Sequence, residues 1–128
     1  MAEPVTQYLL DSVILIDHFN GISAATRFLH EQHQTLSISV ITRAEVLTGF
    51  APNTLALARQ FLETFPVLPI EARDTDLAAQ LRREHRWKLP DAFQAALALN
   101  HLLKLATRNT TDFSPDKYAF VFVPYTLP

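Results

Sequence analysis

Several acidic residues stand beside apolar segments, where a carboxylate needs a compensating partner. Asp11 follows the apolar segment 5–10, Glu45 follows the segment 36–40, and Asp91 opens a predicted helix. An ionised carboxylate directly after a buried strand is costly unless hydrogen bonds or a cation compensate it. Carboxylates brought together also raise each other's pKa, unless a hard divalent cation lies between them. These residue types and positions predict an oxygen-ligand site for Mg²⁺ or Mn²⁺.

The chemistry that such a site supports is metal-assisted hydrolysis of a phosphodiester. A bound ion lowers the pKa of a water molecule, positions it for in-line attack and stabilises charge on the phosphate. Asn109 and Asp112 follow a further apolar segment at 105–107 and would add oxygen atoms to the same place. The chain therefore contains enough ligands for this chemistry if its fold gathers them.

The elements that must position these acids are alternating strands and helices. Apolar and β-branched runs predict five short strands, at 5–10, 36–40, 67–70, 105–107 and 119–123. Helical spacing, caps and prolines predict the intervening helices, which begin after Asp11 and then cover about 23–33, 42–50, 53–65, 74–86 and 90–103. This alternation is typical of an α/β fold with a parallel sheet covered on both faces. In such sheets ligands bind beyond the carboxyl ends of the strands.

Some of these acids have simpler explanations. Glu45 stands three residues after Thr42, which is the spacing of a capping box. Asp91 is an acid in a first helical turn, and Asp112 fits a turn, so each is also explained by local structure. Asp17 is assigned to the solvated side of the first helix. Asp11 has no such local explanation, and function is the favoured interpretation there.

Composition restricts the class of protein. The chain has 128 residues, of which 48% are hydrophobic and 19% charged, so one globular domain over residues 1–128 is expected. It contains no cysteine, which excludes thiol catalysis and a Cys-based zinc site and agrees with a cytoplasmic location. No apolar run is long enough for a membrane span, so no membrane partner is expected.

Four strings, in order along the chain, resemble the motifs of PIN-domain nucleases, in particular VapC-type toxins. They are residues 9–17 (LLDSVILID), 38–46 (ISVITRAEV), 89–96 (LPDAFQAA) and 105–113 (LATRNTTDF). Any one of them alone is weak evidence, but four in order at fitting separations are specific. The resemblance runs from about residue 7 to residue 124.

The resemblance implies a PIN-like three-layer α/β/α sandwich on a short, mainly parallel central sheet. It further implies an endoribonuclease that hydrolyses RNA with Mg²⁺ or Mn²⁺. By position, Asp11 and Asp91 would be metal ligands, Glu45 a ligand or water-orienting base, and Asp112 a more distant catalytic contributor. The supporting polar wall would comprise Ser12, Thr107 and Asn109.

The expected partners are an RNA substrate, a cognate antitoxin protein and a second copy of the chain in a homodimer. The formal charge of −2 gives no broad attraction for nucleic acid, so RNA contacts must be local. A basic run at 82–88 precedes Asp91, and phosphates need cations near an acidic site. The residues proposed to contact RNA are Arg43, Arg86, Lys88 and Arg108.

An alternative from another class is a catalytically silent PIN-like module that binds RNA or protein. Two departures from the family pattern support this alternative. Val13 replaces a small polar residue of the first motif, and Asn109 replaces an acid of the fourth. Receiver domains and haloacid-dehalogenase-type phosphatases are disfavoured, because the phosphatase needs a second aspartate where Val13 stands and the receiver needs adjacent acids at the first strand.

Overall fold

Five short strands alternate with helices in the computed structural model, which describes residues 6–128. The helices are α1 (Ser12–Phe19), α2 (Ser23–Glu31), α3 (Val40–Thr48), α4 (Leu55–Leu62), α5 (Ala72–His85) and α6 (Leu89–Asn100), with a 3-10 turn, η1, at His33–Thr35. The strands are β1 (Tyr8–Leu10), β2 (Leu36–Ser39), β3 (Val67–Leu68), β4 (Lys104–Ala106) and β5 (Val121–Phe122). Each predicted strand is present, four of them in shortened form and the fourth along the chain shifted by one residue; the predicted start of the first, Val5, lies outside the described residues.

All neighbouring strands are parallel, in the order β3-β2-β1-β4-β5. Leu10 at the end of β1 lies beside Ala106 at the end of β4. The chain leaves β1, β2 and β4 at the same edge of the sheet, as expected for parallel strands joined by helical crossovers. The residues that follow these three strands are therefore brought together.

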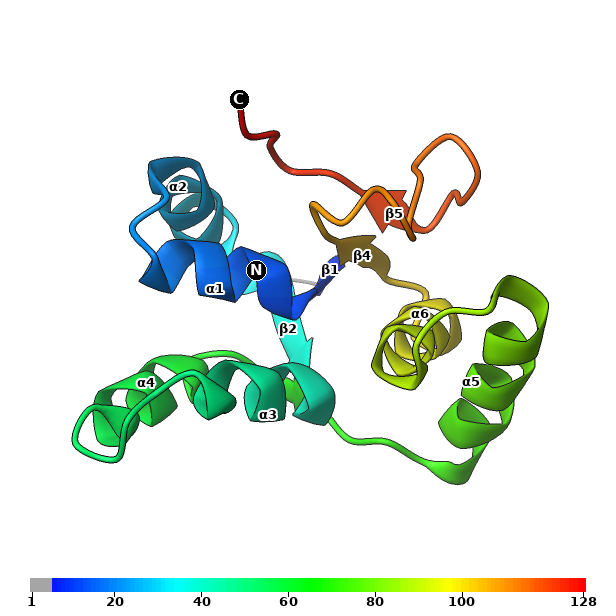
Figure 1. Cartoon of the computed structure of the whole chain (residues 1–128), viewed down its shortest axis with the longest axis horizontal. Coiled ribbons are helices and arrows are strands. Elements are labelled where there is room, and N and C mark those ends of the chain that lie inside the picture. Colours follow the sequence, from blue (N-terminus) through cyan, green and yellow to red (C-terminus); the bar gives the residue numbers. More distant parts are fainter. Residues whose placement is uncertain (1–5) are drawn as a thin grey trace, which may run out of the picture.

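Helices cover both faces of the sheet, which makes three layers (Figure 1). Successive residues of a strand point to opposite faces. Accordingly, Leu9 and Leu105 join the core formed with α5 and α6, whereas Leu10 and Ala106 join the core formed with α1, α2, α3 and α4. The predicted α/β/α sandwich is confirmed, and its sheet is parallel throughout the described residues.

The start of α3 differs from the prediction. The N-cap of α3 is Ser39, whose Oγ accepts a hydrogen bond from the backbone N–H of Thr42 at 3.0 Å. The predicted capping box of Thr42 with Glu45 is therefore wrong. The reason is tertiary: Thr42 is fully buried, and its hydroxyl donates to the carbonyl oxygen of Leu10 at 3.1 Å.

The ends of α5 and α6 are marked by residues with left-handed backbone. Arg86 caps α5 with a φ of 60°, and Leu102, just after α6, has a φ of 56°. Residues other than glycine rarely adopt this conformation. Because Leu102 turns the chain sharply toward β4, α6 ends at Asn100 and not at the predicted residue 103. Within residues 6–128, no helix has the length and apolar character needed to cross a membrane.

Candidate active site

Asp11 is the link between β1 and α1. Its backbone N–H bonds to the carbonyl of Ala106 on β4, and its side chain caps α1 by accepting from the backbone N–H of Ser12 at 2.9 Å. The Thr107 hydroxyl donates to Oδ2 of Asp11 at 2.7 Å. Burial raises the pKa of Asp11, and hydrogen bonds from Thr107, Ser12 and Gln94 oppose this shift without cancelling it. The strand end thus holds a buried carboxylate that lacks a cationic partner among the described residues.

The loop after β4 contributes a second group of polar side chains. The backbone N–H of Asn109 donates to Oγ1 of Thr107 at 3.0 Å, and the amide Nδ2 of Asn109 donates to Oδ2 of Asp112 at 3.1 Å. The indole of Trp87 donates to the carbonyl oxygen of Asp112 at 3.2 Å. Thr107 therefore connects directly to Asp11, and the loop fixes the position of Asp112.

Glu45 approaches the same place from α3. Its side chain reaches solvent, but partial burial raises the pKa of Glu45, and the negative charge of Asp11 raises it further. Hydrogen bonding to the Ser12 side chain acts in the opposite direction. Ser12, itself buried, thus interacts with both acids, with Asp11 through its backbone N–H and with Glu45 through its side chain.

Asp91 completes the acidic cluster from the first turn of α6. A helix N-terminus favours the ionised form of an acid. Nevertheless, burial and, to a smaller extent, the charges of Asp11, Asp112 and Glu45 together raise the pKa of Asp91 to about 6, against the opposing effect of Lys88. The fold thus brings together all four acids predicted from the sequence, and their charges repel.

The donor set suits a hard divalent ion. The four acids and Asn109 present oxygen atoms only, which Mg²⁺ and Mn²⁺ prefer. Within the part of the chain that the structure describes, no three His, Asp or Glu side chains are already arranged to hold a metal ion. Magnesium usually keeps several waters and uses one or two protein carboxylates together with substrate phosphates, so these residues fit the ion without a closed cage.

A buried polar network lies beneath the acids and was not predicted from the sequence. The Ser39 hydroxyl donates to Oε1 of Gln94 at 2.7 Å, and Nε2 of Gln94 donates to Oγ1 of Thr42 at 2.6 Å. Because Thr42 also bonds to Leu10, the network ties α6 and α3 to β1. A signal was present in the sequence: Gln94 is an amide in the middle of an alanine-rich helix, with alanines on most of its neighbouring positions.

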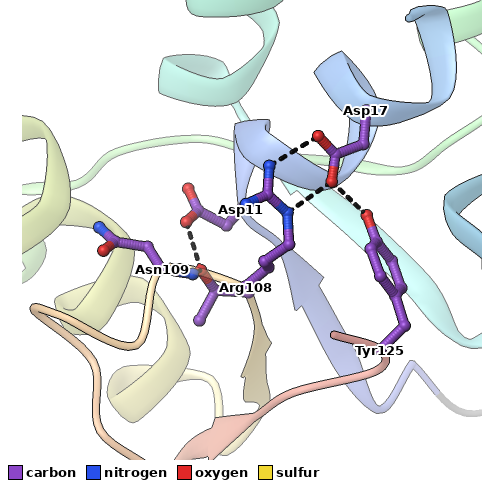
Figure 2. A network of polar contacts seen from close by, with 6 residues as sticks. Asp11, Asp17, Arg108, Asn109 and Tyr125 are labelled. Carbon is purple, nitrogen blue, oxygen red and sulfur yellow. Dashed lines mark hydrogen bonds and ion pairs between the residues drawn. The ribbon is translucent and has the colours of Figure 1, made fainter. Parts of the chain in front are cut away.

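The prediction that Asp17 is solvated is wrong. Asp17 is only 5% exposed, and it forms two hydrogen bonds with the Arg108 guanidinium, 2.7 Å from Nε to Oδ2 and 2.8 Å from Nη2 to Oδ1. The Tyr125 hydroxyl donates to Oδ2 of Asp17 at 2.7 Å. These partners come from the loop after β4 and from the C-terminal segment, so spacing along α1 could not reveal them (Figure 2).

The basic residues predicted to contact RNA occupy different settings. The guanidinium of Arg108 is engaged by Asp17, and that of Arg43 lies 3.7 Å from Glu63. Arg86 and Lys88 are exposed and have no carboxylate within ion-pair distance in residues 6–128. Arg86 lines a surface groove with Arg82, Arg83 and Leu89, close to the start of α6. Of the four residues predicted to contact RNA, Arg86 and Lys88 therefore keep their charged groups free of an ion pair, and Lys88 is close enough to Asp91 to lower its pKa.

Comparison with protein families gives one match over most of the chain. The family model of the PIN domain matches residues 8–115. This range contains Asp11, Glu45, Asp91 and Asp112 and ends before Tyr125. A search of curated proteins gave no match.

Solved structures give further matches. A chain of a toxin–antitoxin complex from Klebsiella pneumoniae is 36% identical, with a TM-score of 0.87, and the match covers 94% of this chain and 100% of that one. A chain of DNA-bound VapBC from Salmonella typhimurium is 21% identical, with a TM-score of 0.74 and coverage of 84% and 90%. A chain of FitAcB from Neisseria gonorrhoeae is 24% identical, with a TM-score of 0.76 and coverage of 92% and 98%. The last two likenesses show the fold alone.

Proposed function

The chain belongs to the PIN-domain family, and from this premise we propose that it is a metal-dependent endoribonuclease, the toxin of a VapC-type toxin–antitoxin pair. The observation that carries this proposal is the acidic cluster. The pKa of Asp91 is raised to about 6 by burial and by three neighbouring carboxylates. Within residues 6–128 none of the four acids forms an ion pair, and a concentration of negative charge of this kind at one sheet edge is suited to a divalent ion from solution.

Each residue of the cluster has a proposed task. Asp11 and Asp91 hold the ion directly, and Glu45, which reaches solvent, orients the attacking water or adds a ligand. Asp112 acts through water, held in place by Asn109. Ser12 and Thr107 fix the Asp11 carboxylate through the hydrogen bonds that they donate to it. When bound, Mg²⁺ or Mn²⁺ would lower the pKa of a coordinated water and stabilise charge on the phosphate.

The proposed RNA contacts lie where cations are free. Arg86 and Lys88 are exposed between α5 and α6, and Lys88 is close enough to Asp91 to lower its pKa. A phosphate backbone lying in the groove beside Arg86 would reach the acids at the start of α6. Arg43 is a further candidate on the α3 side.

The proposed protein partners are a cognate antitoxin and a second copy of the chain. The support for an antitoxin is the likeness to a chain of a toxin–antitoxin complex at 36% identity. The support for a homodimer is the family resemblance. Light scattering of the purified protein, alone and with the antitoxin, tests both assemblies.

The proposed activity is tested by incubating purified protein with a panel of single-stranded RNAs in Mg²⁺, Mn²⁺ or EDTA. The variants are Asp11→Asn and Asp91→Asn, and the matched control is Asp76→Asn, since Asp76 is an exposed acid on α5. We expect cleavage that needs the metal, is lost in both site variants and persists in the control. If wild type and site variants are equally inactive, or equally active, the catalytic proposal fails and the binding-module alternative replaces it.

A further inference from the structure

Three consecutive residues after β4 each bond to a different carboxylate. Thr107 donates to Asp11 at 2.7 Å, Arg108 donates to Asp17 at 2.7 and 2.8 Å, and the Asn109 side chain donates to Asp112 at 3.1 Å. The outer two belong to the proposed active site, and the middle one does not. Because the three residues are consecutive, the orientation of the Arg108 side chain is coupled through the backbone to Thr107 and Asn109, which donate to Asp11 and Asp112.

The middle contact is extended by the C-terminal segment. The hydroxyl of Tyr125 donates to Oδ2 of Asp17, the same oxygen atom that accepts from Nε of Arg108 (Figure 2). Asp17 thus joins α1, the loop after β4 and the C-terminal segment. Tyr125 lies beyond residues 8–115, the part of the chain that the PIN-domain family model matches.

We propose that Asp17, Arg108 and Tyr125 form a clamp that positions Thr107, Asn109 and Asp112 against Asp11. This inference rests on the proposed nuclease function, because it assigns positioning residues to that site. The three clamp residues touch neither metal nor RNA. They act by fixing the loop after β4 at a second point on α1.

Geometry explains why a second attachment point matters. Asp11 and Asp17 are six residues apart on α1, which is about 9 Å along a helix that rises 1.5 Å per residue. The loop is also held by the bond from the Thr107 N–H to the Phe122 carbonyl and by the Trp87 indole at Asp112, but without Arg108 its attachment toward α1 would rest on the one bond from Thr107 to Asp11, about which the segment could still turn. The bidentate contact at Asp17 removes this freedom, because two parallel N–H···O bonds fix the orientation of the guanidinium. Positions of groups around a metal must be held within a fraction of an ångström for full activity.

The burial of the pair favours positioning over stability as its purpose. A buried ion pair is weak evidence for stability, since its desolvation cost offsets much of the attraction, whereas fixing one unique arrangement is a better attested role. Nε and Nη2 of Arg108 are engaged by Asp17, and withdrawing them to bind a phosphate would leave Asp17 buried without its cation. The proposed task of this edge of the guanidinium is therefore the contact with Asp17.

The test compares Arg108→Ala, Arg108→Lys and Tyr125→Phe with two controls. Tyr118→Phe is matched to Tyr125→Phe because Tyr118 also has one hydroxyl contact, to Nδ1 of His85 at 3.2 Å. Arg27→Ala is matched to Arg108→Ala because Arg27 is an exposed arginine on α2. The measurements are kcat and KM for RNA cleavage, Mn²⁺ affinity by calorimetry without RNA, and amide hydrogen exchange of residues 107–112 in metal-free protein.

We expect Arg108→Ala to lower kcat and Mn²⁺ affinity by about 10- to 100-fold, the usual cost of losing a group that orients metal ligands. KM should stay within about twofold, because substrate binding is not the function lost. Tyr125→Phe and Arg108→Lys should give smaller losses in the same two quantities, and amide exchange in the loop should accelerate. If Arg108→Ala does not fold, Tyr125→Phe, which keeps the ion pair, decides the question.

Three results would overturn the clamp. A higher KM with a weaker salt dependence, at unchanged kcat and Mn²⁺ affinity, would make Arg108 an RNA contact. A lower melting temperature with unchanged kcat, Mn²⁺ affinity and loop exchange would make the cluster merely structural. If the wild type cleaves no RNA, the nuclease proposal fails by itself. The clamp then fails only if amide exchange of the loop is the same in Tyr125→Phe, Tyr118→Phe and wild type.

Discussion

Asp11 is the N-cap of α1 and Asp17 lies within this helix, and each residue is 5% exposed. The pKa values of the two carboxylates nevertheless shift in opposite directions. The pKa of Asp11 is raised by burial, and its hydrogen-bond donors are neutral. The pKa of Asp17 is lowered, chiefly by its hydrogen bonds with the Arg108 guanidinium. The fold pairs one buried acid with a cation, whereas the other has no cationic partner among the residues that the structure describes.

This difference between the two carboxylates bears on the proposed metal site at Asp11. The means to neutralise a carboxylate exist next to Asp11, because Arg108 directly follows Thr107, which bonds to it. The guanidinium nevertheless pairs with Asp17. The acids at the end of the sheet have no ion-pair partner among residues 6–128, which supports the proposed site for a divalent ion.

The largest effect on stability is expected for Asp17→Asn. It removes the charge that pairs with Arg108, and breaking a largely buried pair costs about 3 kcal/mol of unfolding free energy. Urea unfolding at pH 7 measures this change, with Asp76→Asn as a control expected within about 0.5 kcal/mol of wild type. A loss no larger than that of the control would mean that the Asp17 pair compensates nothing.

Mn²⁺ should stabilise the wild type by about 2.7 kcal/mol when present at 100 times its Kd, because it binds the folded state only. In Asp11→Asn this stabilisation should be lost, whereas in Asp17→Asn it should persist in weakened form, since Asp17 only positions the site. Melting curves at increasing Mn²⁺ concentration measure both. Equal stabilisation of Asp11→Asn and wild type would place the ion elsewhere.

A smaller effect is expected from pH. The pKa of Asp91 is about 6 in the folded protein, above the value of about 4 usual for an unfolded chain, so the native state holds its proton more tightly. Its contribution to stability is therefore present below about pH 4 and is lost as pH rises through about 6. Because Asp91 is partly exposed, we expect the metal-free protein to lose roughly 1 kcal/mol of unfolding free energy through this group as pH rises across that range.

The measurement for this effect is urea unfolding in EDTA at pH 5 and pH 7.5. Asp91→Asn should reduce the loss of stability between these two values, and the substitution should stabilise the metal-free protein at pH 7.5. A variant with the same pH dependence as wild type would contradict the raised pKa of Asp91.

The smallest effect is expected for Lys88→Ala. Lys88 lowers the pKa of Asp91, but it is an exposed lysine whose charge is screened by solvent. Its removal should raise the pKa of Asp91 by less than about half a unit, because exposed charge pairs contribute little. Carboxyl NMR titration measures the shift. A shift of several units would mean that Lys88 compensates the acids much as Arg108 compensates Asp17.

Much of the fold follows from local patterns in the sequence. The five strand positions, the alternation with helices and the placement of acids after strands come from apolar runs and helix signals. These patterns are local because burial of one strand or one helix face constrains residues close in sequence. The errors concern boundaries and caps, as at Ser39 and Thr42, where a tertiary contact to Leu10 decides which hydroxyl caps the helix.

The sequence predicted the acids of the candidate site and the polar residues Ser12, Thr107 and Asn109 beside them, but not the more distant residues that support these groups. Asp11, Glu45, Asp91 and Asp112 could be identified because charge beside apolar segments is unusual and because the motifs resemble a family. Gln94 and Tyr125 were missed as partners, since their contacts join positions 52 to 108 residues apart. Nothing in a local pattern specifies which distant residue will meet such a side chain.

The sequence by itself determined the kind of fold and the chemical character of the site: a parallel α/β sheet and a set of oxygen donors placed after its strands. Only the tertiary structure decided which acids stay uncompensated and which one is paired. The reason is that a charge state depends on burial and on neighbours within a few ångströms, and those neighbours are chosen by packing. Asp11 and Asp17 have similar neighbours in the sequence, but in the folded protein the pKa of Asp11 is raised and that of Asp17 is lowered.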